Sequence, residues 1–309
     1  MIGAPFDGGT TYRAGARFGP LAIRTADYID HEPYRPSLAL GIDPLSALGV
    51  VDAGDVRMPQ GDIEKSVELL ERAVTTIAEA DAIPIVLGGD HTIAPPDVTG
   101  VANKYGHGRV SVIHFDAHAD TAETTAGLLL GHGTPMRRLI DSGAARGDRF
   151  LQVGPRGYSP DSPVLEWMRE QGMHWFEMTE VVERGLDACV TEAFERAMDD
   201  CDGVFLSIDV DVVDPGIAPA PGRSSRAGSR RESCSSRAPL RPGGAGGGAG
   251  RSRGVAAIRW AGQRHGGVGE SGRAGGAVEY RTSTTGCRGG VMAPHGCPAL
   301  LSPHRAQTT

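Results

Sequence analysis

The sequence predicts an α/β fold built on a mostly parallel β-sheet, and three observations support this prediction. Short apolar segments alternate with helix-like segments through the first 215 residues. Segment 83–87 is wholly apolar, as is typical of a parallel strand that is covered on both faces. Several apolar segments run directly into polar residues, and the carboxyl ends of parallel strands meet at one edge, where functional sites lie.

The first elements surround a glycine- and arginine-rich loop. Residues 3–7 are expected to end a strand, Pro20 to open a short helix, and residues 50–52 to form a second strand. The loop between them, 10–19, could contact a substrate or a subunit, but close packing of loop on loop explains its glycines at least as simply.

A long amphipathic helix is expected after Asp62, which is a good N-cap. Its apolar positions recur at spacings of four and three, at Ile63, Val67, Leu70, Val74 and Ile77. Strand 83–87 follows and enters Gly88 and Gly89, which let the backbone turn sharply. This turn places His91 at the carboxyl end of the strand.

The remaining elements continue the alternation. The expected strands are 110–113, 150–153, 174–176 and 204–208, and the expected helices are 163–171 and 186–198. Strand 110–113 leads into segment 114–120, and strand 204–208 leads into segment 209–215. Both of these segments are rich in carboxylates.

The segment after strand 110–113 carries a polar side chain at every second residue, at Asp116, His118 and Asp120. Alternate residues of an extended segment point to the same side. Two carboxylates and an imidazole gathered at one point are unfavourable unless a cation lies between them. A polar loop after a strand would explain one such residue. Other strand ends, however, add three more candidate metal ligands, His91, Asp209 and Asp211.

These six candidates offer four carboxylates and two imidazoles, with no thiolate. Such a donor set favours a hard or borderline divalent ion, with Mn²⁺ as the first choice. Six protein ligands exceed what one ion usually takes, so a pair of ions bridged by shared carboxylates fits better. Such a pair produces hydroxide near neutral pH. The residues therefore predict a binuclear metallohydrolase.

Charge and composition exclude several other classes. The chain of 309 residues has a net charge of −7, which argues against a nucleic-acid or membrane-surface partner for the chain as a whole. No apolar run reaches the roughly 18 residues of a transmembrane helix, and the first residues do not resemble a signal peptide. The five cysteines are odd in number and show no paired metal spacing. We therefore expect a cytoplasmic protein in a reducing compartment.

Three segments together resemble the signatures of the arginase/agmatinase ureohydrolase family. They are Gly-Gly-Asp-His at 88–91, Asp-Ala-His-Ala-Asp at 116–120 and Ser-Ile-Asp-Val-Asp-Val-Val-Asp-Pro at 207–215. The resemblance covers about residues 1–219. Segments 10–24, 51–55 and 131–135 are more similar to the agmatinase branch than to the arginases, although Ala14 stands where that branch often has proline.

The resemblance implies a three-layer α/β/α fold, a homo-oligomer (trimer or hexamer) and a small guanidino substrate. One manganese ion would take His91, Asp116, Asp120 and Asp209, and the second would take Asp116, His118, Asp209 and Asp211. Hydroxide would attack the guanidinium carbon, with Asp120 orienting it and passing its proton to the departing amine. His132 matches a proton-shuttle or substrate-contacting histidine. Agmatine would give urea and putrescine.

Alternatives remain within this interpretation. The enzyme could be another guanidino-acid hydrolase, such as a guanidinobutyrase, or the chain could be a metal-binding but inactive remnant. Asp90 is expected to support its loop, and His114 to be a packed core histidine. Arg156 could reach a substrate, with a structural ion pair as at least an equal explanation.

The composition changes abruptly after residue 222. Residues 223–309 contain 14 Arg, no Lys, no Asp, 3 Glu and 19 of the 45 Gly, while residues 1–222 have a net charge of −18. We therefore divide the chain into a truncated ureohydrolase catalytic domain, 1–222, and an aberrant Arg/Gly/Ser/Pro-rich tail, 223–309, which is disordered or out of frame. An arginine-rich nucleic-acid arm is the rival explanation, but regular Arg-Gly-Gly repeats and interleaved aromatic residues are missing.

Our hypothesis is that a shift of the reading frame produced this tail. Between Pro219 and Ser235, synonymous codons read one base out of frame can yield Gly-Thr-Gly-Thr-Leu-Glu-Pro-Gly-Gly-Leu-Ser-Ser-Arg-Glu-Leu-Leu, which has the form of the family sequence expected there. A one-base deletion near the Pro219 codon would produce the printed tail. The fold would then be incomplete at its carboxyl terminus, with an exposed apolar sheet edge that favours aggregation. We expect poor folding and little or no ureohydrolase activity.

Overall fold

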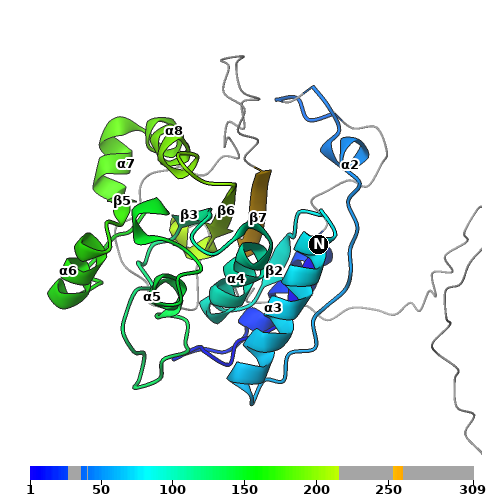
Figure 1. Cartoon of the computed structure of the whole chain (residues 1–309), viewed down its shortest axis with the longest axis horizontal. Coiled ribbons are helices and arrows are strands. Elements are labelled where there is room, and N and C mark those ends of the chain that lie inside the picture. The colour runs from blue at the N-terminus through cyan, green and yellow to red at the C-terminus, as the bar shows by residue number, and fades with distance from the viewer. Residues whose placement is uncertain (27–35, 40, 216–252, 260–309) are drawn as a thin grey trace, which may run out of the picture. The chain divides into compact units, whose positions relative to one another are not determined.

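The computed structural model describes residues 1–26, 36–39, 41–215 and 253–259. The proposed frame shift at Pro219 and most of the 223–309 tail lie outside the described residues. The described part of the chain forms alternating strands and helices around one sheet (Figure 1).

The sheet has seven strands in the order β1-β2-β7-β6-β3-β4-β5, and every pairing is parallel. The strands are β1 (Ile2–Ala4), β2 (Val86–Gly88), β3 (Val110–Phe115), β4 (Phe150–Val153), β5 (His174–Phe176), β6 (Gly203–Ile208) and β7 (Arg253–Arg259). The predicted α/β fold with a parallel sheet is thus confirmed.

Strand β7 was not anticipated from the sequence. We expected the sheet to lack its last strands, yet the backbone of Arg253–Arg259 lies between β2 and β6 and pairs with both. A strand at this position satisfies backbone groups that would otherwise be left along the facing edges of β2 and β6. The sheet is therefore continuous from β1 to β5.

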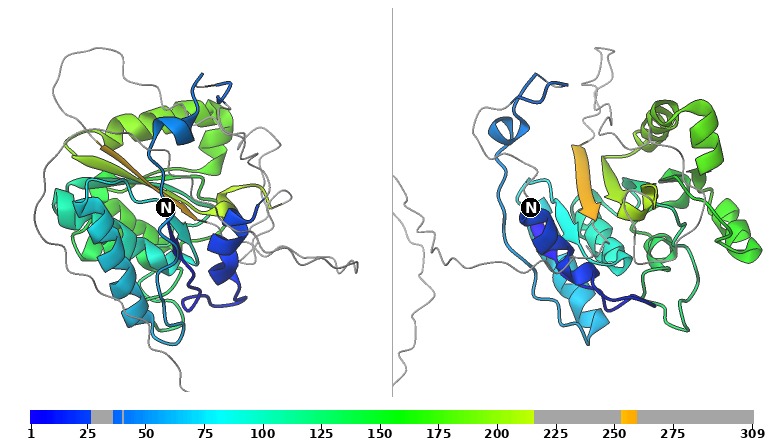
Figure 2. Two further views of the ribbon diagram at one scale, coloured as in Figure 1. Left: turned by 90° about the vertical axis from the view of Figure 1, so that its right-hand side faces the viewer. Right: turned by 180° about the vertical axis from the view of Figure 1, so that it is seen from behind.

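Helices cover both faces of the sheet (Figure 2). The helices of the described residues are α1 (Gly19–Arg24), α2 (Pro44–Ala47), α3 (Ile63–Glu79), α4 (Ala94–Tyr105), α5 (Pro135–Asp141), α6 (Ser162–Glu170), α7 (Met178–Arg184) and α8 (Leu186–Ala197). Of these, the short helix α2 buries none of its residues. Side chains of β3 alternate between the two cores: Val112 packs in the core that contains α3 and α4, and Ile113 in the core that contains α7 and α8. This arrangement is a three-layer α/β/α fold. No helix in the described ranges is long and apolar enough to cross a membrane.

Helix α3 follows its sequence signals closely. The side chain of Asp62 accepts a hydrogen bond from the Lys65 amide at 2.9 Å, which caps the first turn. The apolar face buries Leu70 and Val74 completely. At about 25 cal/mol per Å² of apolar surface, each such side chain contributes roughly 1.5–3 kcal/mol toward holding α3 on the sheet.

The strand expected at residues 50–52 does not form. The segment nevertheless runs beside the start of the chain. The Ala53 amide donates to the Met1 carbonyl, the Gly3 amide to the Gly54 carbonyl and the Val56 amide to the Gly3 carbonyl, each at 2.8 Å. Gly54 has φ 77°, which interrupts extended pairing. Gly3 and Asp55 form an isolated β-bridge rather than part of a strand, and Val51 is exposed.

Gly89 allows β2 to turn toward the functional edge. A Cβ atom at this residue would lie 2.3 Å from the Phe6 carbonyl oxygen and 2.6 Å from that of Ala4. Those atoms belong to the backbone and cannot move aside easily. The close approach lets the Asp90 amide donate to Phe6 at 2.8 Å, and this places His91 at the carboxyl end of β2.

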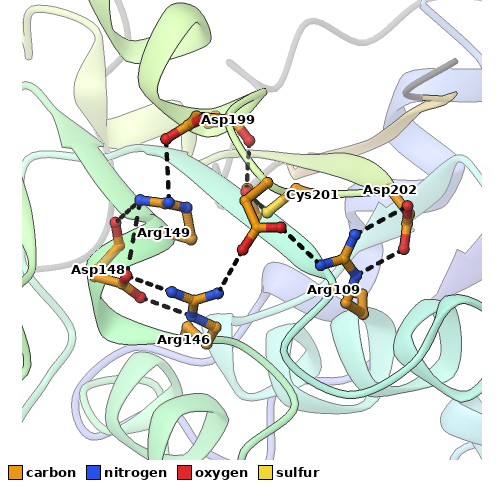
Figure 3. A network of polar contacts seen from close by, with 10 residues as sticks. Arg109, Arg146, Asp148, Arg149, Asp199, Cys201 and Asp202 are labelled. Atoms are coloured by element: carbon orange, nitrogen blue, oxygen red, sulfur yellow. Dashed lines mark hydrogen bonds and ion pairs between the residues drawn. The ribbon is translucent and has the colours of Figure 1, made fainter. Parts of the chain in front are cut away.

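A network of charged residues joins the opposite, amino ends of the central strands (Figure 3). Arg109, just before β3, donates to Asp202, just before β6, at 2.8 Å. Arg146, before β4, donates to Asp148 at 2.6 Å and to Asp200 at 3.3 Å. These exposed contacts fix β3, β4 and β6 relative to one another, away from the functional edge.

Candidate metal centre

Asp116 lies at the centre of the candidate site, immediately after β3. It is almost completely buried, and its Oδ1 accepts a hydrogen bond from the His118 amide at 2.7 Å. The imidazole of His118 lies with Nδ1 3.0 Å from Asp211 Oδ2 and 3.5 Å from Asp116 Oδ1. The Asp211 side chain is fixed in turn, because its Oδ1 accepts from the Ala117 amide at 3.1 Å.

His91 gathers the other carboxylates. Its Nδ1 lies 2.6 Å from Asp120 Oδ2, 3.1 Å from Asp116 Oδ2 and 3.4 Å from Asp209 Oδ2. None of these approaches has the alignment of a hydrogen bond, so this buried nitrogen has no hydrogen-bond partner within the described structure. Nitrogen and oxygen atoms that lie this close together without a hydrogen bond between them have the arrangement expected of ligands to one cation.

All six candidate metal ligands predicted from the sequence therefore converge at one edge of the sheet. The possible ligand atoms form two groups, and within each group they lie within 4.8 Å of one another. One group is His91, His114 and Asp116, and the other is Asp116, His118 and Asp211. Asp116 belongs to both groups, as a carboxylate shared by two ions would. The residues present thus fit a pair of divalent ions, and their role as ligands stays a prediction.

The electrostatics of the cluster also favour a cation. Burial opposes the charged form of His91, but Asp120, Asp116 and Asp209 outweigh it and hold the pKa of His91 well above its ordinary value. Contacts with Asp116 and Asp211 raise the pKa of His118 to about 11. Both shifts reflect the negative charge gathered around these two imidazoles, which a bound cation would offset.

The pKa values of Asp211 and Asp116 are shifted in opposite directions. Burial, together with the charges of Asp209 and Asp116, raises the pKa of Asp211 well above its ordinary value. Asp116 is also buried, but the three neighbouring imidazoles of His114, His118 and His91 outweigh burial and hold its pKa well below the usual range. The neighbouring imidazoles therefore favour the anionic form of Asp116.

Asp120 has an unusual backbone conformation. Its φ is 51°, in the left-handed region that non-glycine residues seldom adopt, and its carbonyl accepts a hydrogen bond from the Met136 amide at 3.0 Å. Such a conformation costs about 1–3 kcal/mol and persists where the surroundings impose it, commonly at functional sites. The turn at Asp120 directs its carboxylate back toward His91.

The loop after β6 is held by Arg156. The guanidinium donates to the backbone carbonyls of Asp211 at 2.6 Å, Val212 at 3.1 Å and Val213 at 3.2 Å. The sequence suggested a substrate contact or an ion pair for Arg156, and these hydrogen bonds are neither. They run from a side chain to the backbone and fix the short helix Val210–Val212. This role could not be predicted from the sequence, because backbone acceptors carry no residue signature.

The amino-terminal loop contacts the histidine at position 132. His132 Nε2 lies 2.8 Å from Thr11 Oγ1, and the His132 amide donates to the Gly9 carbonyl at 3.2 Å. Asp90 accepts hydrogen bonds from the amides of Gly9 and Thr92, both at 2.8 Å, as expected of a loop-supporting residue. Within the described residues, the side-chain contact of His132 is thus with Thr11 rather than with the six candidate ligands.

A parallel α/β sheet with a carboxylate and imidazole cluster beyond its strand ends defines a class of metal-dependent hydrolase. The chain belongs to the arginase family, because the family model named Arginase matches residues 1–235. Enzymes of this family are binuclear metal hydrolases, and its ureohydrolases act on guanidino C–N bonds.

Three similar proteins illustrate the range within the family. The chain is 34% identical over 222 residues to a guanidinobutyrase of Pseudomonas aeruginosa, covering 72% of this chain and 67% of that protein. It is 34% identical over 230 residues to a mitochondrial agmatinase of Gallus gallus, covering 74% and 65% respectively. A Trypanosoma cruzi formiminoglutamase solved with Mn²⁺ superposes with a TM-score of 0.65 at 28% identity, covering 74% of each chain.

Proposed function

We propose that this chain encodes a binuclear manganese hydrolase that cleaves a guanidino group to urea and an amine. The observation that carries the proposal is the position of His91 Nδ1, within 3.4 Å of three carboxylate oxygens and aligned with none of them. The six candidate ligands would together hold two ions, and both ions would share Asp116 and Asp209. Bound Mn²⁺ would supply Lewis-acid activation of water near neutral pH.

The protein groups would then position substrate and move protons. Asp120 carries the carboxylate closest to His91 and is the proposed proton acceptor and donor, which would pass a proton to the departing amine. His132, linked to Thr11, is the proposed second proton-carrying or substrate-contacting group. The free thiols of Cys189 and Cys201 are compatible with the cytoplasm as the proposed compartment.

Agmatine is the proposed substrate, with putrescine as the second product. The support is the similarity of segments 10–24, 51–55 and 131–135 to the agmatinase branch. A guanidino acid is the second candidate, because the chain is as similar to a guanidinobutyrase as to an agmatinase. The segment that would follow Asp214 and Pro215 lies outside the described residues, so substrate choice rests on these similarities.

A metal analysis combined with a urea assay tests the proposal. The purified chain is loaded with Mn²⁺ and assayed for urea with agmatine, 4-guanidinobutyrate and arginine. Two Mn²⁺ per chain with urea from agmatine, even at a slow rate, support the proposed function. Two Mn²⁺ without urea from any substrate favour the inactive remnant, and urea from 4-guanidinobutyrate alone favours the guanidino-acid hydrolase. A chain that binds no Mn²⁺ contradicts all three.

A further inference from the structure

His114 is a fully buried histidine among the candidate metal ligands. Its Nε2 lies 2.8 Å from Asp116 Oδ2, and its ring meets that of His91 edge-on, with centroids 4.8 Å apart. By position alone, His114 could be a third imidazole ligand. It could equally be a residue that directs Asp116 without touching an ion. The two roles require opposite protonation of Nε2, since a ligand needs a lone pair there and a donor needs a hydrogen.

Gln152 on β4 decides between these two roles. Its Nε2 donates to the Ala119 carbonyl at 2.8 Å, and the same nitrogen lies 3.2 Å from His114 Nδ1. A carbonyl only accepts, so the amide group must present its NH₂ to Ala119, and the reverse orientation would bring two oxygens together. The second hydrogen of that NH₂ then points to His114 Nδ1, which must be the acceptor.

This contact fixes the tautomer of His114. A neutral imidazole carries one hydrogen, and if Nδ1 accepts, the hydrogen lies on Nε2. Nε2 faces Asp116 Oδ2, so His114 presents an N–H to the carboxylate and has no lone pair free for a metal ion. The contact is close but not aligned as a regular hydrogen bond, so its attraction is chiefly that of a dipole for a charge.

We propose that Gln152 and His114 form a positioning pair for Asp116, an inference that rests on the proposed metal-binding function. His118 donates its amide to Asp116 Oδ1 at 2.7 Å, and His114 faces Oδ2. The hydrogen bond on Oδ1 and the N–H dipole beside Oδ2 together orient the carboxylate of Asp116, and they leave lone pairs of both oxygens for an ion. Groups that orient a metal ligand in this way typically change metal affinity by about 10–100-fold when removed.

The experiment compares Mn²⁺ binding by the full chain and four variants. His114→Phe removes the N–H but keeps a ring, and Gln152→Leu removes the amide that fixes the tautomer. His114→Gln restores an N–H at a similar reach. Phe150→Leu is the matched control, because Phe150 packs edge-on against the His114 ring with centroids 6.1 Å apart and its side chain has no N–H or O–H to offer to Asp116. Circular dichroism and thermal melting establish that each variant is folded.

We expect His114→Phe and Gln152→Leu to weaken Mn²⁺ binding about 10–100-fold while two ions still bind at saturation. His114→Gln should recover part of this loss, and Phe150→Leu should lower the melting temperature with unchanged Mn²⁺ affinity. In the metal-free wild type with ¹⁵N-labelled histidine, NMR should find His114 protonated at Nε2. Electron spin-echo spectra of bound Mn²⁺ should count the same number of imidazole ligands in the wild type and in His114→Phe.

Three results would overturn the positioning pair. Wild-type binding of two Mn²⁺ with unchanged affinity in both His114→Phe and Gln152→Leu would reduce the pair to packing alone. Loss of one imidazole coupling in His114→Phe would make His114 a ligand. A proton on Nδ1 in the wild type would contradict the tautomer. These results leave the proposed metal site intact, whereas a wild type that binds no Mn²⁺ would overturn both proposals together.

Discussion

His91 Nδ1 and Asp120 Oδ2 lie 2.6 Å apart without forming an aligned hydrogen bond. The pair joins two loops that are 29 residues apart in the sequence, one after β2 and the other after β3. The parallel sheet brings them together because both loops leave it at the same edge. The backbone of Asp120, in the left-handed region, completes the approach.

We predict that Asp120→Asn folds normally but loses function. Asn tolerates the left-handed conformation nearly as well as Asp, while its amide can neither hold a cation nor accept a proton in the same way. In the protein encoded by the gene with the missing base restored, the substitution should lower urea release roughly 10²–10⁴-fold, as measured in a coupled urea assay. Asp120→Ala should also lower the free energy of unfolding by about 1 kcal/mol, because alanine is strained at φ 51°. Wild-type activity in Asp120→Asn would remove Asp120 from the proposed chemistry.

Arg156→Met should weaken metal binding although Arg156 is not a ligand. The substitution leaves the carbonyls of the loop after β6 without their common donor, and that loop carries Asp209 and Asp211. We expect the Kd for Mn²⁺ to rise about 10-fold in a titration. Arg149→Met is the control, since Arg149 contacts Asp148 and Asp199 at the opposite end of the sheet. Equal effects of the two variants on Mn²⁺ binding would show that loss of an arginine alone, rather than of the loop contact, is responsible.

The charged network at the amino ends of the strands should make stability depend on pH. Hydrogen bonds from Arg109 hold the pKa values of Asp200 and Asp202 below the ordinary value. A carboxylate with a lowered folded pKa contributes stability that is full above its unfolded pKa of about 3.9 and is lost as the pH falls through the folded value.

Arg109→Met should therefore be less stable than the wild type at pH 7, and the difference should shrink below about pH 4. Denaturant unfolding of the metal-free proteins at several pH values measures it. Because the network is exposed, the difference at pH 7 should also decrease at high salt. A difference that stays constant from pH 7 to pH 3 would show that Arg109 acts through packing rather than through charge.

The gene should contain a one-base deletion close to the codon for Pro219. The chain as printed should release little urea, and a gene with the missing base restored should encode a more active protein, when both are assayed with agmatine and Mn²⁺. Sequencing across that codon is the direct measurement. An intact reading frame that matches the printed protein, or a normal rate of urea release by the printed chain, would contradict the frame shift.

Much of the fold could be predicted because its signals are local. The apolar spacing of α3 and the N-cap Asp62 are properties of one segment, and both predict the observed helix. The convergence of six candidate ligands followed from one rule about the carboxyl ends of parallel strands. In contrast, residues 50–52 do not form the regular strand that was expected, and the φ of 77° at Gly54 interrupts the extended pairing beside β1.

Other features could not be predicted because they depend on contacts that have no residue pattern. The bonds of Arg156 end on backbone carbonyls, which every residue offers. The protonation of His114 depends on Gln152, 38 residues away, through the carbonyl of Ala119. Strand β7 lies in a segment whose composition indicated no strand, and its place in the sheet follows from the pairing needs of β2 and β6.

The number of Mn²⁺ ions bound per chain tests the central claim most directly. Elemental analysis of the dialysed, Mn²⁺-loaded protein should give two ions for the wild type. For Asp116→Ala it should give fewer than one, because the carboxylate proposed to be shared by both ions is removed while the protein stays folded by circular dichroism. A wild type without bound Mn²⁺, or an Asp116→Ala variant that still binds two ions, would contradict the account of this site.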